Sequence, residues 1–190
     1  MDKVQTRPAT LADVRALAVL HVETWQAAYR GLLPDALLDS MGVEARDQSW
    51  RRILAEGGNV CLAVRGPLLL GFSSYGDCRD EDASTHVGEL FGLYVRPDAW
   101  NTGVGRRLHD VAMSALASAG SHEATLWVLD RNRRARQFYE RQGWRADGIV
   151  KTDDRPGAIL TEVRYRRFLT TGLMPGIGHD ADHHLLGLGF

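Results

Sequence analysis

The chain has few cysteines, no long apolar run and no long block of one charge, and each absence excludes a class of protein. Its two cysteines, Cys61 and Cys78, form neither a Cys-x-x-Cys pair nor a metal-ligand pattern, so we expect two free thiols in a reducing cytoplasm. No apolar run approaches the ~20 residues that cross a bilayer, and the first residues lack a secretory apolar segment, which predicts a cytoplasmic protein without a membrane partner. The formal net charge of −1 argues against nucleic acid binding by phosphate neutralisation.

What the chain contains is enough for one folded α/β domain. A length of 190 residues, with 44% hydrophobic and 25% charged residues, is typical of a globular protein with a buried core. We expect one domain over residues 1–169, because no linker or internal repeat interrupts its apolar patterns. The patterns predict strands at 4–7, 59–65, 68–75, 89–95, 124–129, 144–150 and 159–168, and helices at 11–29, 34–38, 43–55, 104–119 and 132–142.

Residues 170–190 differ in composition and are expected to form a C-terminal extension rich in glycine and histidine. The run from His179 to His184 contains imidazoles and carboxylates, which are metal ligands. All of these candidate ligands lie in one short stretch without a second cluster, so we expect no metal. A flexible extension and a segment that docks on another subunit are both open interpretations.

The stretch from Glu89 to His109 is the centre of the chain, because it places a glycine-containing loop between a strand and a helix. The bulky strand run stops at Pro97, and Gly103 and Gly105 precede a run with helical spacing. Such a loop exposes backbone N–H groups at the positive end of the helix dipole, where phosphate binds. The loop is neither a Walker motif nor a complete dinucleotide motif, and its spacing alone leaves an ordinary strand–helix turn equally open.

A second block, from Asn132 to Trp144, reads Asn-x-x-Ala-x-x-Phe-Tyr-x-x-x-Gly-Trp and follows the glycine loop in the chain. Together with Val95-Arg-Pro97 and Gly103-Val-Gly105, this block resembles the two motifs of the GNAT N-acetyltransferase family. The resemblance covers about residues 4–168. One departure is Trp100, which stands where the family's pyrophosphate motif usually has arginine or glutamine, so one side-chain contact of that motif is missing.

The resemblance implies both the fold and the cofactor. The fold is α/β, with a mixed, mostly antiparallel central sheet that is flanked by helices and splayed beside its central strand, where acetyl-CoA enters. Backbone N–H groups of the loop would hold the pyrophosphate. The pantetheine arm would pair with the end of the central strand and with Asn132, which can also cap the following helix. The implied cofactor-binding residues are Leu93, Tyr94, Val95, Asn101, Thr102, Gly103, Val104, Gly105, Arg106 and Asn132.

Acetyl transfer to an amine needs a base for the amine, a donor for the oxyanion and a proton for the leaving thiolate. The resemblance implies Tyr139 as the acid beside the CoA sulfur, although a tyrosine on a helix face can also fill the core. Glu89, at the start of the central strand, is the candidate base, and a solvated carboxylate is an equally open interpretation. His86 is its rival, with Asp77 and Glu23 as weaker ones. A backbone N–H of the central strand is expected to meet the oxyanion.

The acceptor side is marked by Trp25 and Tyr29, one helical turn apart in a segment that resembles a small-molecule branch of the family. Core packing is an equally open interpretation of this pair. The acidic run from Asp77 to Asp82 either favours a cationic acceptor or is simply solvated. We therefore expect direct transfer of acetyl from acetyl-CoA to a primary amine of a small molecule. The alternatives are a protein or peptide acceptor and a catalytically silent acyl-CoA-binding module, and a homodimer is left open.

Overall fold

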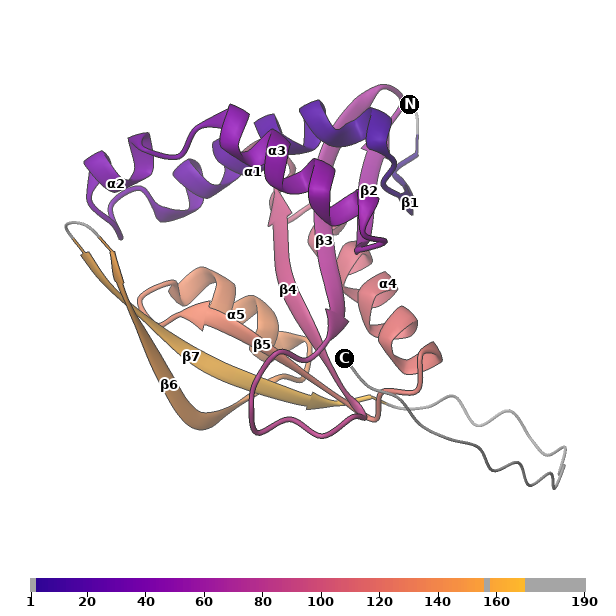
Figure 1. Ribbon diagram of the computed structural model, residues 1–190, viewed down its shortest axis with the longest axis vertical. Helices are drawn as coiled ribbons and strands as arrows, with labels where there is room; N and C mark the ends of the chain where they lie inside the picture. Colours follow the sequence, from indigo (N-terminus) through magenta and orange to yellow (C-terminus); the bar gives the residue numbers. More distant parts are fainter. Residues whose placement is uncertain (1–2, 156–157, 170–190) are drawn as a thin grey trace, which may run out of the picture.

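The chain folds into a seven-stranded sheet with helices on both faces (Figure 1). The computed structural model describes residues 3–155 and 158–169, so the predicted C-terminal extension and its histidine run lie outside the described residues. The helices are α1 (Val14–Tyr29), α2 (Asp35–Asp39), α3 (Val43–Ala55), α4 (Val104–Ser118) and α5 (Arg133–Arg141), with short 3₁₀ turns at Leu11–Asp13 and Pro97–Ala99. The strands are β1 (Gln5–Pro8), β2 (Asn59–Arg65), β3 (Leu68–Asp77), β4 (Val87–Val95), β5 (Glu123–Leu129), β6 (Arg145–Arg155) and β7 (Ala158–Phe168).

The strand order across the sheet is β1-β2-β3-β4-β5-β7-β6. Every neighbouring pair is antiparallel except β4 and β5, which run parallel. The helix α4 makes the crossover between these two strands, as a parallel connection requires. This arrangement confirms the predicted mixed, mostly antiparallel sheet flanked by helices.

The parallel pairing of β4 and β5 is short. It joins Val87 to Glu123, Gly88 to Ala124 and Glu89 to Thr125, and no residue beyond Glu89 is paired with β5. Figure 1 shows the two strands diverging from this point. The remainder of β4 therefore has one edge paired with β3 and the other edge open, which confirms the predicted splay.

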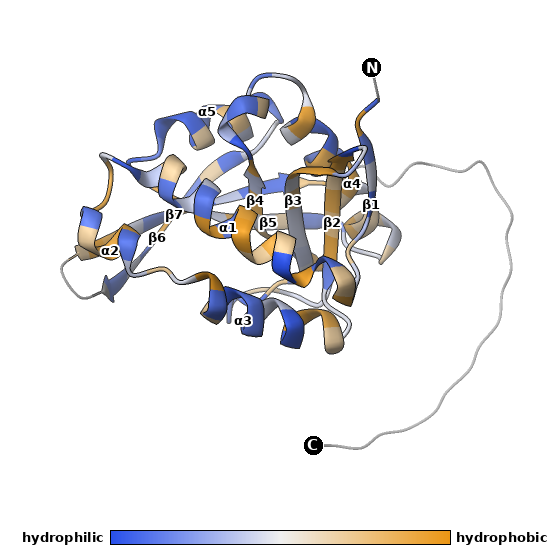
Figure 2. Ribbon diagram, turned by 90° about the horizontal axis from the view of Figure 1, so that it is seen from above, coloured by the Kyte–Doolittle hydropathy of each residue, from blue (hydrophilic) through white to orange (hydrophobic). Residues whose placement is uncertain are grey.

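The two faces of the sheet are covered by different helices. Helices α1 and α3 cover one face through a buried cluster that includes Leu17, Trp50 and Phe72. Helix α4 covers the other face, where Leu108 packs against β2 and β3 residues, and α5 joins a cluster around Trp144. Figure 2 shows hydrophobic residues on β2 and on parts of α1 and α3, and mainly hydrophilic residues along β6 and β7. Within the described ranges, no helix is both long and apolar enough to span a bilayer.

The last hairpin is longer than predicted. The sequence indicates a polar loop between strands at 144–150 and 159–168, but β6 continues to Arg155 and β7 begins at Ala158. Cross-strand pairs such as Lys151 opposite Glu162 carry the ladder through this polar segment. This part of the hairpin has no buried face, so its sequence lacks the alternation of apolar and polar residues by which a strand is recognised.

A buried histidine lies beside the open part of the sheet. The imidazole of His21 is enclosed by Trp50, Phe72 and Tyr94, with ring centroids 4.8–5.5 Å away. The Trp50 indole N–H donates to Nδ1 of His21 over 3.2 Å. Burial lowers the pKa of His21 to about 3, and the positive charge of Arg46 lowers it further. The ring is therefore neutral in the folded protein at neutral pH.

This burial predicts acid sensitivity. An unfolded histidine titrates near ~6.5, so protons bind the unfolded chain first as the pH falls towards the folded value of about 3. From about pH 7.5 to about pH 5, His21 should lower the free energy of unfolding by about 2 kcal/mol. We expect His21→Gln to remove that part of the pH slope in urea titrations. The control, His86→Gln, changes an exposed imidazole, and equal slopes in the two variants would contradict the assignment.

Candidate active site

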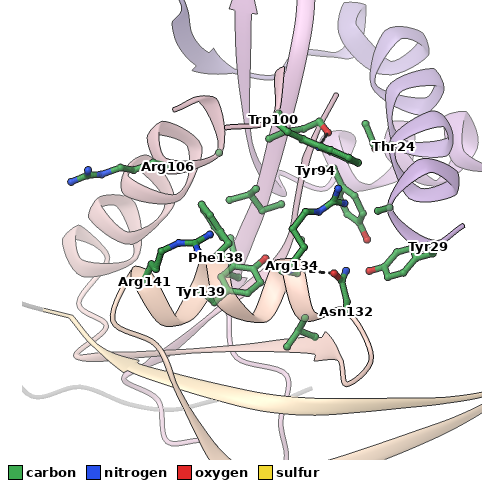
Figure 3. Close-up of a pocket in the computed structure, with 18 of the residues that line it drawn as sticks. Thr24, Tyr29, Tyr94, Trp100, Arg106, Asn132, Arg134, Phe138, Tyr139 and Arg141 are labelled. Carbon is green, nitrogen blue, oxygen red and sulfur yellow. Dashed lines mark hydrogen bonds between the residues drawn. The ribbon is translucent and has the colours of Figure 1, made fainter. Parts of the chain in front are cut away.

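A cavity of about 350 Å³ opens where β4 and β5 separate. It is lined by the open part of β4, the loop before α4, helix α5, and residues of α1, β5 and β7 (Figure 3). The cavity brings together ten residues singled out from the sequence, namely Tyr29, Leu93, Tyr94, Val95, Asn101, Gly103, Gly105, Arg106, Asn132 and Tyr139. Four other candidates, Trp25, Glu89, Thr102 and Val104, are absent from its lining.

The N-terminus of α4 faces this cavity. Gly103 caps the helix with a φ of 88°, a left-handed conformation that favours glycine. The first hydrogen bond of the helix runs from the Arg107 N–H to the Gly103 carbonyl, so the N–H groups of residues 104–106 have no partner inside the helix. A Cβ on Gly105 would lie 3.6 Å from the Phe138 ring, at ordinary contact distance, so Gly105 lies beside the α5 wall of the cavity. Free amides and the helix dipole make this end suitable for an anion.

Thr102 and Val104 support the loop from outside the cavity. The Thr102 hydroxyl donates to the Ala99 carbonyl over 2.7 Å, and the Val104 side chain is buried in the core. Their side chains therefore position the loop, while their backbone belongs to the helix start. Asn101 has a φ of 62°, a left-handed conformation that asparagine tolerates better than most side chains.

Trp100 links the loop before α4 to β4 and to α5. Its indole N–H donates to the Val95 carbonyl over 2.7 Å, which ties the loop to the end of β4. The guanidinium carbon of Arg134, from α5, lies 3.3 Å from the centroid of the Trp100 ring. Figure 3 shows Arg134 extending from α5 across the cavity to Trp100. Burial lowers the pKa of Arg134 from its ordinary value, and this guanidinium brings a positive charge to a loop that has tryptophan at its motif position.

The open edge of β4 offers backbone groups to a ligand. The Arg96 N–H donates to Leu70 on β3, and antiparallel pairs alternate, so the N–H groups of Leu93 and Val95 point away from β3. The Val95 carbonyl on this edge is occupied by Trp100. The remaining groups could pair with an extended ligand as an added strand would.

Helix α5 supplies Tyr139 and Asn132. Tyr139 is buried, and burial raises the pKa of its phenol well above the ordinary value, with a smaller contribution from Tyr94. The phenol is therefore protonated at neutral pH and can donate a proton. The Asn132 side-chain oxygen accepts the Ala135 N–H over 3.1 Å and caps the helix. Its amide nitrogen is left for other partners.

The opposite end of the cavity is rich in hydroxyl groups and aromatic rings. We call Tyr29, Tyr94, Trp127 and Glu162 the acceptor end, because they line the cavity beyond Tyr139 from α1, β4, β5 and β7. Burial raises the pKa of both Tyr29 and Tyr94, and the negative charge of Glu162 adds to this effect. Trp25 packs against Tyr29 with ring centroids 5.3 Å apart, so it supports this wall from behind.

The expectation that the Glu89 carboxylate points into the cleft does not match the structure. Glu89 is buried outside the cavity lining, and its carboxylate accepts three hydrogen bonds from Arg79. These come from the backbone N–H at 3.0 Å, from Nε at 3.0 Å and from Nη2 at 2.6 Å. The Arg79 guanidinium also covers the Phe91 ring at 4.1 Å. His86, the rival base, packs on His122 and does not line the cavity either.

Two carboxylates of the acidic run at Asp77–Asp82 are paired within the protein. Asp80 and Asp82 both accept hydrogen bonds from Arg164, which is 3% exposed. Asp147 accepts from the same guanidinium. Asp80 and Asp82 are therefore paired with a buried arginine that fixes the loop to β7.

The cavity residues that were not predicted from the sequence include Arg134, Trp127 and Glu162. A signal for Arg134 was present, because it belongs to the Asn132–Trp144 block and precedes its alanine. For Trp127 and Glu162 no local signal exists, since they meet only through the pairing of β5 with β7.

Comparisons with known proteins agree with this geometry. The model of the acetyltransferase (GNAT) family matches residues 20–144. The chain is 28% identical to the uncharacterized N-acetyltransferase YuaI of Bacillus subtilis, over 68% of this chain and 73% of that protein. It is also 28% identical to a probable N-acetyltransferase of Mycobacterium tuberculosis, over 88% of this chain and 95% of that protein. The solved PaiA N-acetyltransferase of Thermoplasma acidophilum, in complex with coenzyme A, shares the fold with a TM-score of 0.68 and 18% identity, over 87% of this chain and 99% of that one.

The buried Glu89 carboxylate predicts a structural cost for its removal. Glu89→Gln should lower the free energy of unfolding by about 1.5–3 kcal/mol, because charge-assisted hydrogen bonds to Arg79 are lost. Urea titrations can measure this change. Asp98→Asn breaks the exposed pair with Arg96 and should cost under ~1 kcal/mol. Equal losses of unfolding free energy in the two variants would contradict the structural role of Glu89. Lost turnover with unchanged stability in Glu89→Gln would instead support Glu89 as the base.

Proposed function

Because the chain belongs to the GNAT family of acetyltransferases, we propose that it transfers acetyl directly from acetyl-CoA to a primary amine of a small molecule. One observation carries this proposal. A single cavity holds the free amides of α4, the open edge of β4 and the protonated hydroxyl of Tyr139. In this proposal residues 1–169 form the catalytic domain.

The cofactor end fits a phosphate-bearing thioester. The N–H groups of residues 104–106 and the α4 dipole face the same space as Arg106, Arg134 and Arg141. Arg134, held on the Trp100 ring, supplies a positive charge where the motif lacks its usual arginine or glutamine. The donors at Leu93 and Val95 can hold an extended arm along β4, with the Asn132 amide opposite. These residues are proposed to bind the pyrophosphate and pantetheine of acetyl-CoA.

Acetyl-CoA supplies an activated acetyl thioester, and the chain supplies groups that polarise it and protonate its leaving group. Backbone N–H groups on the open edge of β4 can stabilise a developing oxyanion. Tyr139 is the proposed acid, because its phenol is protonated at neutral pH and it lines the cavity from α5. No cysteine lines the cavity among the described residues, and direct transfer needs no covalent intermediate.

The acceptor end supports a small amine rather than an extended peptide. Its walls are the side chains of Tyr29, Tyr94 and Trp127, which come from three separate elements and converge on one space. Both views place α2 beside the outer part of the β6–β7 hairpin (Figures 1 and 2). Helix α2 and the hairpin therefore flank the side of the molecule where the acceptor end lies. Trp25 is proposed to act by holding Tyr29 in place.

Titration of acetyl-CoA by calorimetry tests the cofactor assignment. We expect micromolar binding by the unaltered protein, and about tenfold weaker binding by Arg134→Ala, equivalent to ~1.4 kcal/mol. Arg133→Ala is the matched control, because this neighbouring arginine does not line the cavity and should bind normally. Absence of binding by the unaltered protein would overturn the function, and equal affinities in both variants would remove Arg134 from the site.

Turnover tests the role of Tyr139. Tyr139→Phe should lower kcat at least about tenfold, or ~1.4 kcal/mol of barrier, while leaving acetyl-CoA affinity unchanged, because only the proton donor is lost. Release of free thiol from acetyl-CoA measures the rate. Tyr165→Phe is the control, since it removes another buried phenol that binds Arg136 and Glu140 outside the cavity. A rate within twofold of normal for Tyr139→Phe would favour a core role or a catalytically silent binding module.

A further inference from the structure

The charges that line the cavity are unevenly distributed. Among the described residues, its lining holds three arginines, Arg106, Arg134 and Arg141, but a single carboxylate, that of Glu162. The arginines belong to α4 and α5, beside the proposed phosphate site. Glu162 belongs to β7, at the acceptor end. A single negative group in an otherwise positive or neutral cavity is suited to a cationic ligand.

A cation of the protein itself already contacts this carboxylate. Lys151 lies opposite Glu162 in the β6–β7 ladder, and its Nζ is 3.2 Å from Oε2 of Glu162. The same Nζ lies 4.1 Å from the centroid of the Trp127 ring. Lys151 thus has the two contacts that a bound ammonium group prefers, a carboxylate and the face of an aromatic ring. Both partners line the cavity, whereas Lys151 does not.

We propose that Glu162 and Trp127 form the subsite for the ammonium group of the acceptor, and that Lys151 fills this subsite until an acceptor replaces it. The inference rests on the proposed function and specifies its substrate class as an aliphatic primary amine that binds as a cation. Replacement is feasible because the Lys151 and Glu162 side chains are 47% and 32% exposed, and such pairs are held weakly.

Glu162 lines the same cavity as Tyr139, the proposed acid. Its negative charge contributes to the raised pKa of Tyr29 and of Tyr94, after the larger effect of burial. Tyr94 in turn contributes to the raised pKa of Tyr139, the proposed acid. An ammonium group bound at Glu162 would therefore share the cavity with the proposed acid.

A lysine-shaped amine tests the subsite directly. n-Butylamine reproduces the four carbons and the ammonium group of the lysine side chain. The Lys151→Ala variant removes that side chain from Glu162 and Trp127, so that n-butylamine can take its position. Saturation-transfer NMR, without acetyl-CoA, should show at least tenfold tighter n-butylamine binding to Lys151→Ala than to the unaltered protein. Adding Glu162→Gln should abolish this gain, and n-butanol should not bind. Lys151→Arg, which keeps a cation in place, should behave like the unaltered protein.

The alternative is an ordinary cross-strand ion pair that only stabilises the hairpin. In that case Lys151→Ala would bind n-butylamine no more tightly than the unaltered protein, and Glu162→Gln would change nothing, which would overturn the inference. Lys151→Thr, which favours a strand, replaces Lys151→Ala if the latter does not fold. Calorimetry with acetyl-CoA distinguishes failure of the subsite from failure of the proposed function. Normal acetyl-CoA binding without any n-butylamine gain rejects the subsite alone, and no acetyl-CoA binding rejects the proposed function.

Discussion

The short parallel pairing of β4 with β5 is the constraint on which the rest of the site depends. Three residue pairs hold these strands together, and beyond Glu89 they diverge. The divergence leaves one edge of β4 without a partner strand and opens the space that α4 and α5 line. Had the pairing continued, the donors at Leu93 and Val95 would be consumed in the ladder. The missing pairing thus leaves backbone groups of β4 that can pair with a ligand.

The frame around this opening is held by buried polar groups that are fully partnered. Arg164 is enclosed by three aspartates, and Glu89 is bound by Arg79. His109, like His21, accepts an indole N–H, here from Trp144 over 2.9 Å. Unpaired polar groups would be costly in a dry interior, so each of these contacts fixes one arrangement of the surrounding elements.

Charge then divides the cavity into two ends. Arginines and free helix amides face one end, and Glu162 with aromatic rings faces the other. An anionic cofactor would therefore bind at the arginine-lined end and a cationic acceptor at the Glu162 end. Their reacting groups would meet near Tyr139. In the proposed site, Arg134 on the Trp100 ring supplies a positive charge at the position where the motif usually has arginine or glutamine.

The sequence by itself determined the order of elements, the helix start at Gly103 and the block from Asn132 to Trp144, because helix periodicity, glycine and capping are encoded locally. It could not place Glu89, since a carboxylate at a strand start faces a cleft or a loop depending on where Arg79 comes to lie. Nor could it find Glu162, which meets Trp127 only through the pairing of β5 with β7. It also missed the outer part of the hairpin, because a strand segment without a buried face carries no apolar alternation. Tertiary structure decided these points, since strand register and long-range ion pairs join residues that are distant along the chain.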